Sequence, residues 1–310
     1  MPRVVYKPFY SGTVGAAPVG GPARPVAAEA ERLGDWRLGA VICAHAGSEV
    51  LDARPWKSNE ARFRYVVKRW TSAFLSAEQR TLLEREAAAG TAVSDPHIVP
   101  ILSAHVCEAP YYYVMPKLEG KTLDDILARV GRVPTAKALW YARQAAEGLA
   151  ALHEIGWLHA DVKPSNLFVG PDGHVTLIDL GYARRADDEP DTESQCVLGT
   201  VDYLAPEAVC SRLRIDARSD LYSLGVTLFR MLTGRLPYVG KTPAEIVAAH
   251  VSAEPPRLRE LVPSVPNDVD ALVRRLLHKQ PQRRHDSAKE LVAELSSLEI
   301  AFLDERVLGA

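Results

Sequence analysis

The chain has 310 residues, which corresponds to about two domains or lobes and to a hydrophobic core that needs no disulfides. It carries 37 Lys and Arg against 39 Asp and Glu, a formal charge of −2, and 47% of its residues are hydrophobic. This balance excludes a strongly basic nucleic-acid coat and an acidic disordered chain, so we expect no nucleic-acid partner. The four cysteines have no CxxC spacing, which argues against a zinc or disulfide framework.

The sequence gives no sign of a membrane-spanning or secretory segment. No apolar run reaches the ~18–20 residues that a bilayer requires. The N-terminus also lacks the continuous apolar stretch of a signal peptide. We therefore expect a cytoplasmic protein with no membrane span.

The first third of the chain predicts a flexible tail followed by a small, strand-rich unit. Residues 11–26 hold four Gly and three Pro, so residues 1–33 are interpreted as a flexible tail. Ser76-Ala77-Glu78-Gln79 is a capping box and predicts a helix that continues to about Ala92. Alternating apolar residues and β-formers predict five strands, at Arg37–Ala44, Glu49–Pro55, Phe63–Trp70, Ile98–Ser103 and Tyr111–Met115.

After Gly120 the hydrophobic pattern changes to a helical period. Apolar residues from Leu139 to His153 recur at helical spacing, and Gly156 is a suitable stop signal. A turn at 171–173 separates two short apolar stretches, and the patterns from Ser219 onward are helical with breaks near 234–239 and 255–266. The predicted fold class is α+β, with a small β-rich lobe and a larger helical lobe.

The strongest chemical signal is the segment His159-Ala160-Asp161-Val162-Lys163-Pro164-Ser165-Asn166, which is predicted to be a loop. Asp179 follows a predicted strand thirteen residues after Asn166, and Ala205-Pro206-Glu207 follows later. Two acids and an Asn on loops suit phosphoryl transfer, in which one carboxylate orients the attacking hydroxyl and the other groups hold Mg²⁺.

With these motifs the chain resembles the Hanks-type (eukaryotic-like) Ser/Thr protein kinases of bacteria, in particular the mycobacterial PknB kind. The resemblance covers roughly residues 36–300. It implies a bilobal kinase fold that phosphorylates Ser or Thr of protein substrates. It also implies a kinase domain over residues 34–305, with an N-lobe at about 34–115, a hinge at 116–120 and a C-lobe at 121–305.

The resemblance assigns the catalytic residues. It makes Asp161 the residue that orients the hydroxyl, and Lys163 a contact of the γ-phosphate. Asn166 and Asp179 become the metal ligands. Lys68, at the end of the segment Tyr65-Val66-Val67-Lys68 in a predicted strand, would hold the α- and β-phosphates. Glu86, ten residues before Pro96, would be its helix partner. A lone Lys/Glu pair is usually a solvated surface pair, but the order of the motifs favours the catalytic interpretation.

The resemblance also assigns the cofactors and the nucleotide site. It implies ATP and Mg²⁺, with Mn²⁺ as an alternative metal. Met115 would be the gatekeeper beside the adenine, and the backbone of Pro116 and Leu118 would pair with the adenine edge. Apolar side chains would enclose the adenine ring, although plain core packing would explain these side chains equally well. Together with the hinge positions, the expected nucleotide-binding residues are Ile42, Val50, Met115, Pro116, Leu118 and Phe168.

The chain departs from the family pattern at three places. The Gly-rich loop has Cys43, His45 and Ser48 at the positions of the three usual glycines, and retains only Gly47. The usual Arg before the catalytic Asp is Ala160, so a phosphate on the activation loop would lose its main receptor. Leu180 replaces the Phe of Asp-Phe-Gly, which is a conservative change.

These departures leave alternatives open. The eroded Gly-rich loop suits a pseudokinase that acts as a nucleotide-binding or scaffolding module, and a kinase-fold enzyme with another acceptor is a third interpretation. The five acids between Arg184 and Gln195 indicate either a solvated face or a loop that needs no phosphate on Thr192 or Ser194. Regulation would then come from elsewhere, such as a partner bound at the Glu86 helix.

The resemblance assigns structural roles to three further residues. Asp220 would be the buried helix residue that holds the backbone of the catalytic loop. Glu207 and Arg284 would form an ion pair. These three are expected to support the site rather than to act in the chemistry.

Overall fold

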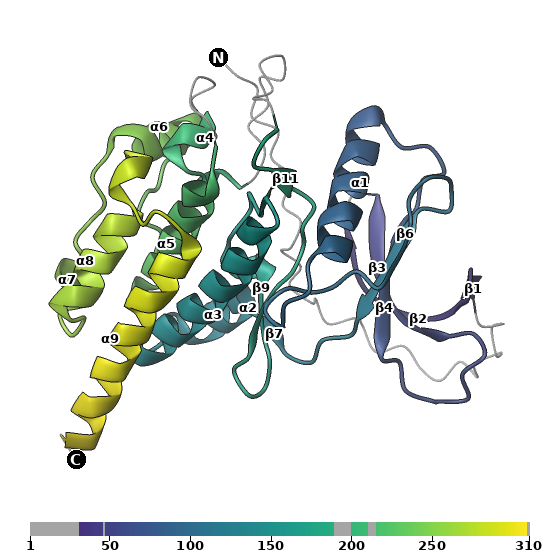
Figure 1. Cartoon of the computed structure of the whole chain (residues 1–310), viewed down its shortest axis with the longest axis horizontal. Coiled ribbons are helices and arrows are strands. Elements are labelled where there is room, and N and C mark those ends of the chain that lie inside the picture. Colours follow the sequence, from purple (N-terminus) through teal and green to yellow (C-terminus); the bar gives the residue numbers. More distant parts are fainter. Residues whose placement is uncertain (1–30, 46, 189–199, 210–214, 309–310) are drawn as a thin grey trace.

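The computed structural model describes residues 31–45, 47–188, 200–209 and 215–308. The first thirty residues of the expected tail lie outside this part, as do Thr192, Ser194 and most of the acidic run before Gln195. The described chain forms a strand-rich part and a larger helical part beside it (Figure 1). This arrangement confirms the predicted α+β architecture with two lobes.

The strand-rich part is one antiparallel sheet with the strand order β1-β2-β3-β4-β6-β5. Its register puts Val50, Lys68 and Tyr113 side by side, because Lys68 is paired with Val50 on one side and with Tyr113 on the other. Cross-strand partners share one face of a sheet, so these three side chains point the same way. The strands are β1 (Arg32–Leu33), β2 (Trp36–His45), β3 (Ser48–Pro55), β4 (Tyr65–Trp70), β5 (Ser103–His105) and β6 (Tyr112–Pro116).

Two expectations about this lobe need correction. Arg32 and Leu33, placed in the flexible tail by their sequence, pair with β2 as strand β1. The sequence also predicts a strand at Ile98–Ser103. Among the described residues, Ile98 to Leu102 form no strand of the sheet, and β5 begins only at Ser103. Pro96 lies just before this stretch and Pro100 lies within it, and neither can donate to a ladder. The backbone of residues 97–99 instead bonds to Leu177 in the helical part, through Leu177 N to His97 O and Val99 N to Leu177 O.

Helix α1 (Ala77–Ala92) packs against the same sheet face that carries Lys68. It begins with the predicted capping box, in which Ser76 and Gln79 exchange side-chain to backbone hydrogen bonds. Leu83 of α1 lies in a buried cluster with residues of β6 and its approach, among them Tyr113. Ala89, one turn past Glu86, joins the core of the helical part instead. The helix therefore connects the two parts of the molecule.

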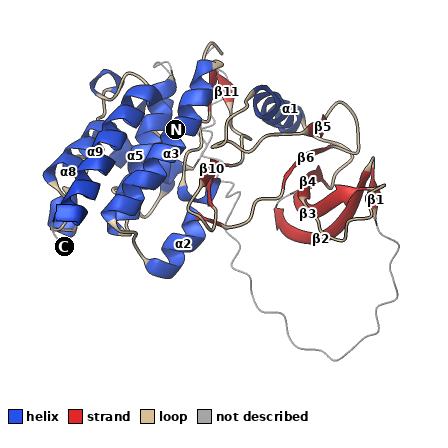
Figure 2. Cartoon of the chain, turned by 60° about the horizontal axis from the view of Figure 1, so that its bottom comes forward, coloured by secondary structure: helices blue, strands red, loops and turns tan. Residues whose placement is uncertain are grey.

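The helices α3 and α5 lie in the middle of the helical part (Figure 2), and both contribute many buried side chains to its core. Among the described residues, no helix is both long and apolar enough to cross a membrane. The helices are α2 (Leu123–Val130), α3 (Thr135–Glu154), α4 (Pro206–Val209), α5 (Ala217–Thr233), α6 (Pro243–Ser252), α7 (Leu258–Leu261), α8 (Asn267–Leu276) and α9 (Ala288–Leu308).

Short strands on the side of the helical part that faces the sheet hold the loops of the candidate site. Strands β7, β9 and β10 form one small antiparallel sheet, and β8 pairs with β11. The loop that carries Asp161 thus lies between β8 and β9, and Asp179 follows β10. The strands are β7 (Lys121–Thr122), β8 (Trp157–Leu158), β9 (Leu167–Val169), β10 (Val175–Leu177) and β11 (Arg184–Arg185).

A buried ion pair ties α4 to the segment before α9. Nη1 and Nη2 of Arg284 donate to the Glu207 carboxylate at 2.6 and 2.8 Å, and the two side chains are 0% and 1% exposed. Ser219 Oγ donates to the same carboxylate, and Arg284 Nε donates to His278 O. The pair therefore has the additional hydrogen bonds that a buried pair needs to be tolerated.

Replacing Glu207 by Ala should lower the free energy of unfolding by about 3–5 kcal/mol, because it leaves the guanidinium buried and unpaired. Asp286→Asn is the matched control: it removes the partner of Arg218 in a pair whose acidic side chain is 78% exposed. Such surface pairs contribute about 0–1 kcal/mol. Urea denaturation of both variants measures the difference, and equal losses would show that the buried pair has no special weight.

Candidate active site

Lys68, Glu86 and Asp179 form a buried cluster where α1, the sheet and the helical part meet. The Lys68 ammonium lies 2.9 Å from Glu86 Oε1, 3.1 Å from Oε2 and 3.6 Å from Asp179 Oδ1. Burial by itself lowers the pKa of Lys68, but the charges of Glu86 and Asp179 outweigh it and raise the pKa. The side chain is therefore a fixed cation whose position is set from two elements.

The two carboxylates differ in their electrostatics. Burial raises the pKa of Glu86, and the charge of Lys68 opposes that rise. Burial acts in the same direction on Asp179, but the charges of Lys68 and Lys163 outweigh it and lower its pKa. Asp179 is thus held as an anion between two lysines.

Asp161, Lys163 and Asn166 lie together on the loop between β8 and β9. Lys163 Nζ is 2.6 Å from Asp161 Oδ2, and Asn166 Nδ2 donates to the same oxygen at 3.0 Å. Thr200, before the short 3₁₀ helix η2 (Val201–Tyr203), donates to Asp161 Oδ1 at 3.1 Å and accepts from Lys163 at 2.6 Å. The Asp161 carboxylate is therefore held on both oxygens.

Two oxygens in this region have the character of metal ligands. Asn166 Oδ1 and Asp179 Oδ2 are both buried, and within the described part of the chain neither has a hydrogen-bond partner. Ile178, the residue before Asp179, donates its backbone N–H to Asn166 O, which brings Asp179 close to Asn166. Buried polar atoms normally find a partner, and carboxylate and amide oxygens suit a hard cation such as Mg²⁺. The residues present fit the expected metal.

The backbone adopts the left-handed region at Ala160, next to Asp161, and at Asp179. Ala160 has φ 60° and Asp179 has φ 64°, conformations that cost non-glycine residues about 1–3 kcal/mol. Asp220 holds the first of them: its two oxygens accept from the backbone N–H of His159 and of Ala160, each at 2.8 Å. This is the role that the resemblance gave to Asp220, and it keeps Asp161 pointing toward Thr200 and Lys163.

The expected nucleotide residues lie on several elements around this cluster. Val50 is next to Lys68 in the sheet, and Met115 and Pro116 end β6 beside Val66 and Tyr65. Ile42 occupies an irregularity in the pairing of β2 with β3, and its side chain is 51% exposed. The two remaining residues are half-buried: Leu118 after β6 and Phe168 in β9.

The structure adds three contacts that the sequence analysis did not contain. Tyr113 donates to Glu86 Oε1, and Thr200 bonds to Asp161. Arg85, the neighbour of Glu86 in α1, lies 3.5 Å from Asp188, whose carboxylate also accepts from the backbone N–H of Arg185. The alternation of β6 could have indicated Tyr113, since Tyr113 and Met115 are two residues apart and share a face. The other two contacts join segments with no common sequence pattern.

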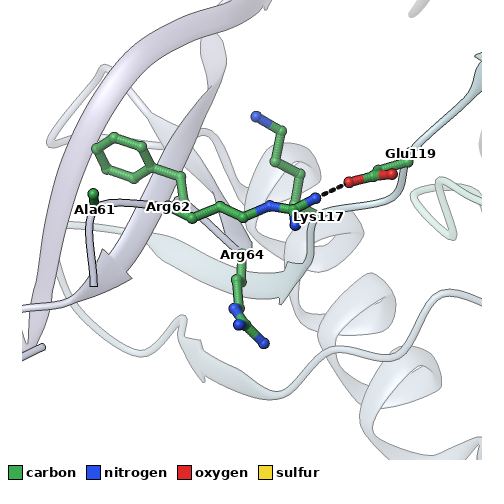
Figure 3. A pocket seen from close by; sticks show the side chains of 6 residues that line it. Ala61, Arg62, Arg64, Lys117 and Glu119 are labelled. Atoms are coloured by element: carbon green, nitrogen blue, oxygen red, sulfur yellow. Dashed lines mark hydrogen bonds and ion pairs between the residues drawn. The ribbon is translucent and has the colours of Figure 1, made fainter.

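A separate surface pocket lies beside the segment that follows β6 (Figure 3). Three basic side chains line it, and each has an acidic partner. Arg62 reaches Glu119, as Figure 3 shows, while Arg64 pairs with Glu60 and Lys117 with Asp52. Because these charges are neutralised, the pocket offers no free cation to an anionic ligand, and it shares no residue with the Lys68 cluster. Its full lining is Ala61, Arg62, Phe63, Arg64, Lys117 and Glu119.

Asp220→Asn should destabilise the protein at pH 7 by about 2 kcal/mol, because an amide nitrogen then faces a backbone N–H. Burial opposes ionisation of Asp220, but the hydrogen bonds from His153 and from the His159 backbone hold its pKa below the ordinary value of 3.8. A lowered pKa contributes stability above pH 3.8 that is lost as the pH falls through the folded-state pKa. Urea denaturation between pH 7 and pH 2 should therefore show a smaller loss in the variant than in the wild type.

The control for this prediction is Asp268→Asn, an exposed residue in the first turn of α8. It should change the free energy of unfolding by no more than about 0.5 kcal/mol and should keep the pH dependence of the wild type. A pH dependence of Asp220→Asn that matches the wild type would contradict the assignment of this titration to Asp220.

Comparison with known proteins identifies the family of this chain. The family model described as "Protein kinase domain" matches residues 48–295. The chain is 39% identical over 234 residues to the serine/threonine-protein kinase pkn2 of Myxococcus xanthus, covering 71% of this chain and 27% of the relative. It is 35% identical over 216 residues to PknB of Mycobacterium leprae, covering 68% and 35%. For PrkC of Bacillus subtilis the identity is 32% over 213 residues, covering 69% and 33%.

The chain thus spans about a third of the length of the curated relatives it matches. The matched region contains the whole Lys68 cluster, the Asp161 loop and the Glu207–Arg284 pair. The chain belongs to the protein kinase family, and within it to the Hanks-type Ser/Thr kinases of bacteria.

Proposed function

We propose that this chain transfers the γ-phosphoryl group of ATP to Ser or Thr hydroxyls of protein substrates. The observation that carries the proposal is that two clusters of charged and polar residues, one around Lys68 and one around Asp161, lie close together between the lobes. Lys68 is bound by Glu86 and Asp179, while Asp161 is bound by Lys163 and Asn166. Phosphoryl transfer depends on positioning and electrostatics, and these are the groups that it requires.

In the proposed reaction each residue acts through its position. Asp161 Oδ1, now bonded to Thr200, accepts the hydrogen bond of the substrate hydroxyl, orients its oxygen and takes the proton late in the transfer. Lys163 and Lys68 neutralise negative charge that develops on the transferred group and on the remaining phosphates. Glu86 contacts Lys68 alone among these groups, so its part is to hold the ammonium in place.

Asn166 and Asp179 would hold the metal through the two buried oxygens that lack a partner among the described residues. Mg²⁺, or Mn²⁺ in its place, supplies charge neutralisation on the phosphate oxygens when it is bound. Lys68 competes for Asp179 through Oδ1 only, which leaves Oδ2 available. The lysine and the metal can therefore use the same carboxylate.

The adenine of ATP is proposed to lie between the sheet and β9. Val50 and Ile42 would cover it from the sheet and Phe168 from below, with Met115 at the inner end. The backbone of Pro116 and Leu118 would supply the polar contacts in the hinge, residues 116–120. The kinase domain would then extend from about residue 34 to 305.

The rival proposal, a non-catalytic nucleotide-binding or scaffolding module, rests on the hairpin between β2 and β3. Cys43 and Ser48, at positions where the family has glycine, take part in the antiparallel ladder. Gly47 is the remaining glycine, and its φ of 91° is needed for the turn itself. The intact Lys68 and Asp161 clusters favour catalysis, since a scaffold has no chemical need of both.

Regulation is proposed to differ from that of relatives that have Arg before the catalytic Asp. Ala160 cannot bind a phosphate. The described start of the loop has a permanent carboxylate, Asp188, bonded to Arg85 of α1. An aspartate at this position links the loop to the Glu86 helix without any modification. A regulatory protein partner that bound the exposed face of that helix would also be able to change the position of Glu86.

Asp161→Asn should leave the affinity for ATP within about threefold and lower the transfer rate by about 10²-fold or more, because it removes the orienting carboxylate but no metal ligand. Asp179→Asn should in addition abolish the gain in ATP affinity on adding Mg²⁺. Isothermal titration with and without Mg²⁺ and a radiolabel transfer assay measure both effects. Asp268→Asn serves as the control and should behave as the wild type; full transfer by Asp161→Asn would refute the mechanism.

Restoring the glycines by Cys43→Gly, His45→Gly and Ser48→Gly together should lower the KM for ATP severalfold, because backbone N–H groups can then come closer to the phosphates. Steady-state kinetics at saturating peptide measure the change. The single change Cys107→Ser, far along the sequence and exposed, is the control. If the KM for ATP stays the same or rises, the hairpin binds ATP in another way. If neither the wild type nor the triple variant transfers phosphate, the rival proposal of a non-catalytic module is supported.

A further inference from the structure

Tyr113 in β6 touches both members of the Lys68–Glu86 ion pair. Its hydroxyl donates to Glu86 Oε1 at 2.5 Å. Its ring centroid lies 5.4 Å from Lys68 Nζ, within the range of a cation–π contact. The residue is 1% exposed, so these contacts are made in a place that excludes water.

The sheet register produces this arrangement. Lys68 and Tyr113 are directly paired between β4 and β6, so their side chains leave the sheet on the face that α1 covers. Trp70, two residues after Lys68 on the same face, packs against the Tyr113 ring at 5.7 Å and lies 5.5 Å from Lys68 Nζ. Two aromatic rings therefore restrict where the ammonium can move, while Glu86 and Asp179 attract it.

A hydroxyl at this position has a physical role that ring packing does not supply. The Glu86 carboxylate is 5% exposed and needs donors to replace the water it has lost. Lys68 supplies one ammonium group to its two oxygens, and Tyr113 supplies a second donor to Oε1. A donor from the sheet also limits the rotation of the carboxylate, because Tyr113 holds Oε1 from β6 while Lys68 contacts both oxygens.

We propose that Tyr113 is a positioning residue that holds the Glu86 carboxylate, and with it helix α1, in the arrangement that directs Lys68 toward the phosphates of ATP. The effect of Tyr113 on catalysis rests on the proposed function, whereas its effect on the position of Glu86 and α1 does not. Because the bond joins β6 to α1 within the N-lobe, it works without the activation loop and complements the Arg85–Asp188 contact on the loop side.

Tyr113→Phe tests the proposal, since it removes the hydroxyl and keeps the ring. Tyr111→Phe is the matched control: Tyr111 lies in the same buried cluster, but its hydroxyl accepts from Arg80. Tyr113→Phe should weaken ATP affinity and kcat/KM for ATP about tenfold, the usual size of a lost hydrogen bond to a charged group. The KM for the peptide should not change, and Tyr111→Phe should stay within about twofold of the wild type.

A double-mutant cycle with Glu86→Ala separates positioning from packing. Once the carboxylate is absent, Tyr113→Phe should have no further effect on ATP affinity. Effects of the two changes that simply add would overturn the proposal, because Tyr113 would then act independently of Glu86.

Amide hydrogen exchange without nucleotide tests the structural part on its own. Tyr113→Phe should speed exchange in the middle of α1, around residues 85–89, about tenfold, and Tyr111→Phe should not. Equal exchange in the two variants would overturn the proposal even if the enzyme were inactive. The two proposals can also fail separately. If the wild type transfers no phosphate, the proposed function is refuted; if exchange is nevertheless faster in Tyr113→Phe and not in Tyr111→Phe, the positioning role of Tyr113 is retained.

Discussion

A buried ammonium group at the meeting point of the two lobes constrains the rest of this structure. Lys68 is 9% exposed at its side chain, and a lone cation there would be strongly unfavourable. It is tolerated because Glu86 comes from α1 and Asp179 from the loop after β10, so three separate elements must meet. The docking of α1 on the sheet and the approach of the helical part are therefore both conditions for the burial of one charge.

The helical part meets this condition with a strained backbone. Asp179 and Ala160 both have positive φ, and neither is glycine. Hydrogen bonds that surround the two residues offset the strain: Asp220 binds the N–H groups of His159 and Ala160, and Gly181 N donates to Asp179 Oδ1. The core around α3 and α5 makes these bonds possible, since Asp220 projects from the buried face of α5. Packing around α3 and α5 is in this way connected to the orientation of Asp161.

The departures from the family pattern fall outside the Lys68–Glu86–Asp179 cluster, chiefly on the hairpin between β2 and β3 and on Ala160. This hairpin has an irregular register around Ile42 and pairs regularly from the Cys43/Val50 pair to the His45/Ser48 pair, with Gly47 in the turn. Ala160 removes a receptor for a loop phosphate, while Arg85 and Asp188 already join α1 to the start of that loop. Under the proposed function, the chain combines the charged clusters of an active kinase with altered contacts to the nucleotide and to a regulatory phosphate.

The sequence by itself determined most of the elements and the identity of the charged residues. Alternation, helical period and the Ser76 capping box are local signals, and α1 and four of the five expected strands follow them closely. The tertiary structure alone decided which groups meet: Tyr113 on Glu86, Thr200 on Asp161, and residues 97–99 on β10 instead of the sheet. The physical reason is that a local period specifies which face of an element is buried, whereas a hydrogen bond between residues 27 or 39 positions apart depends on how the elements pack.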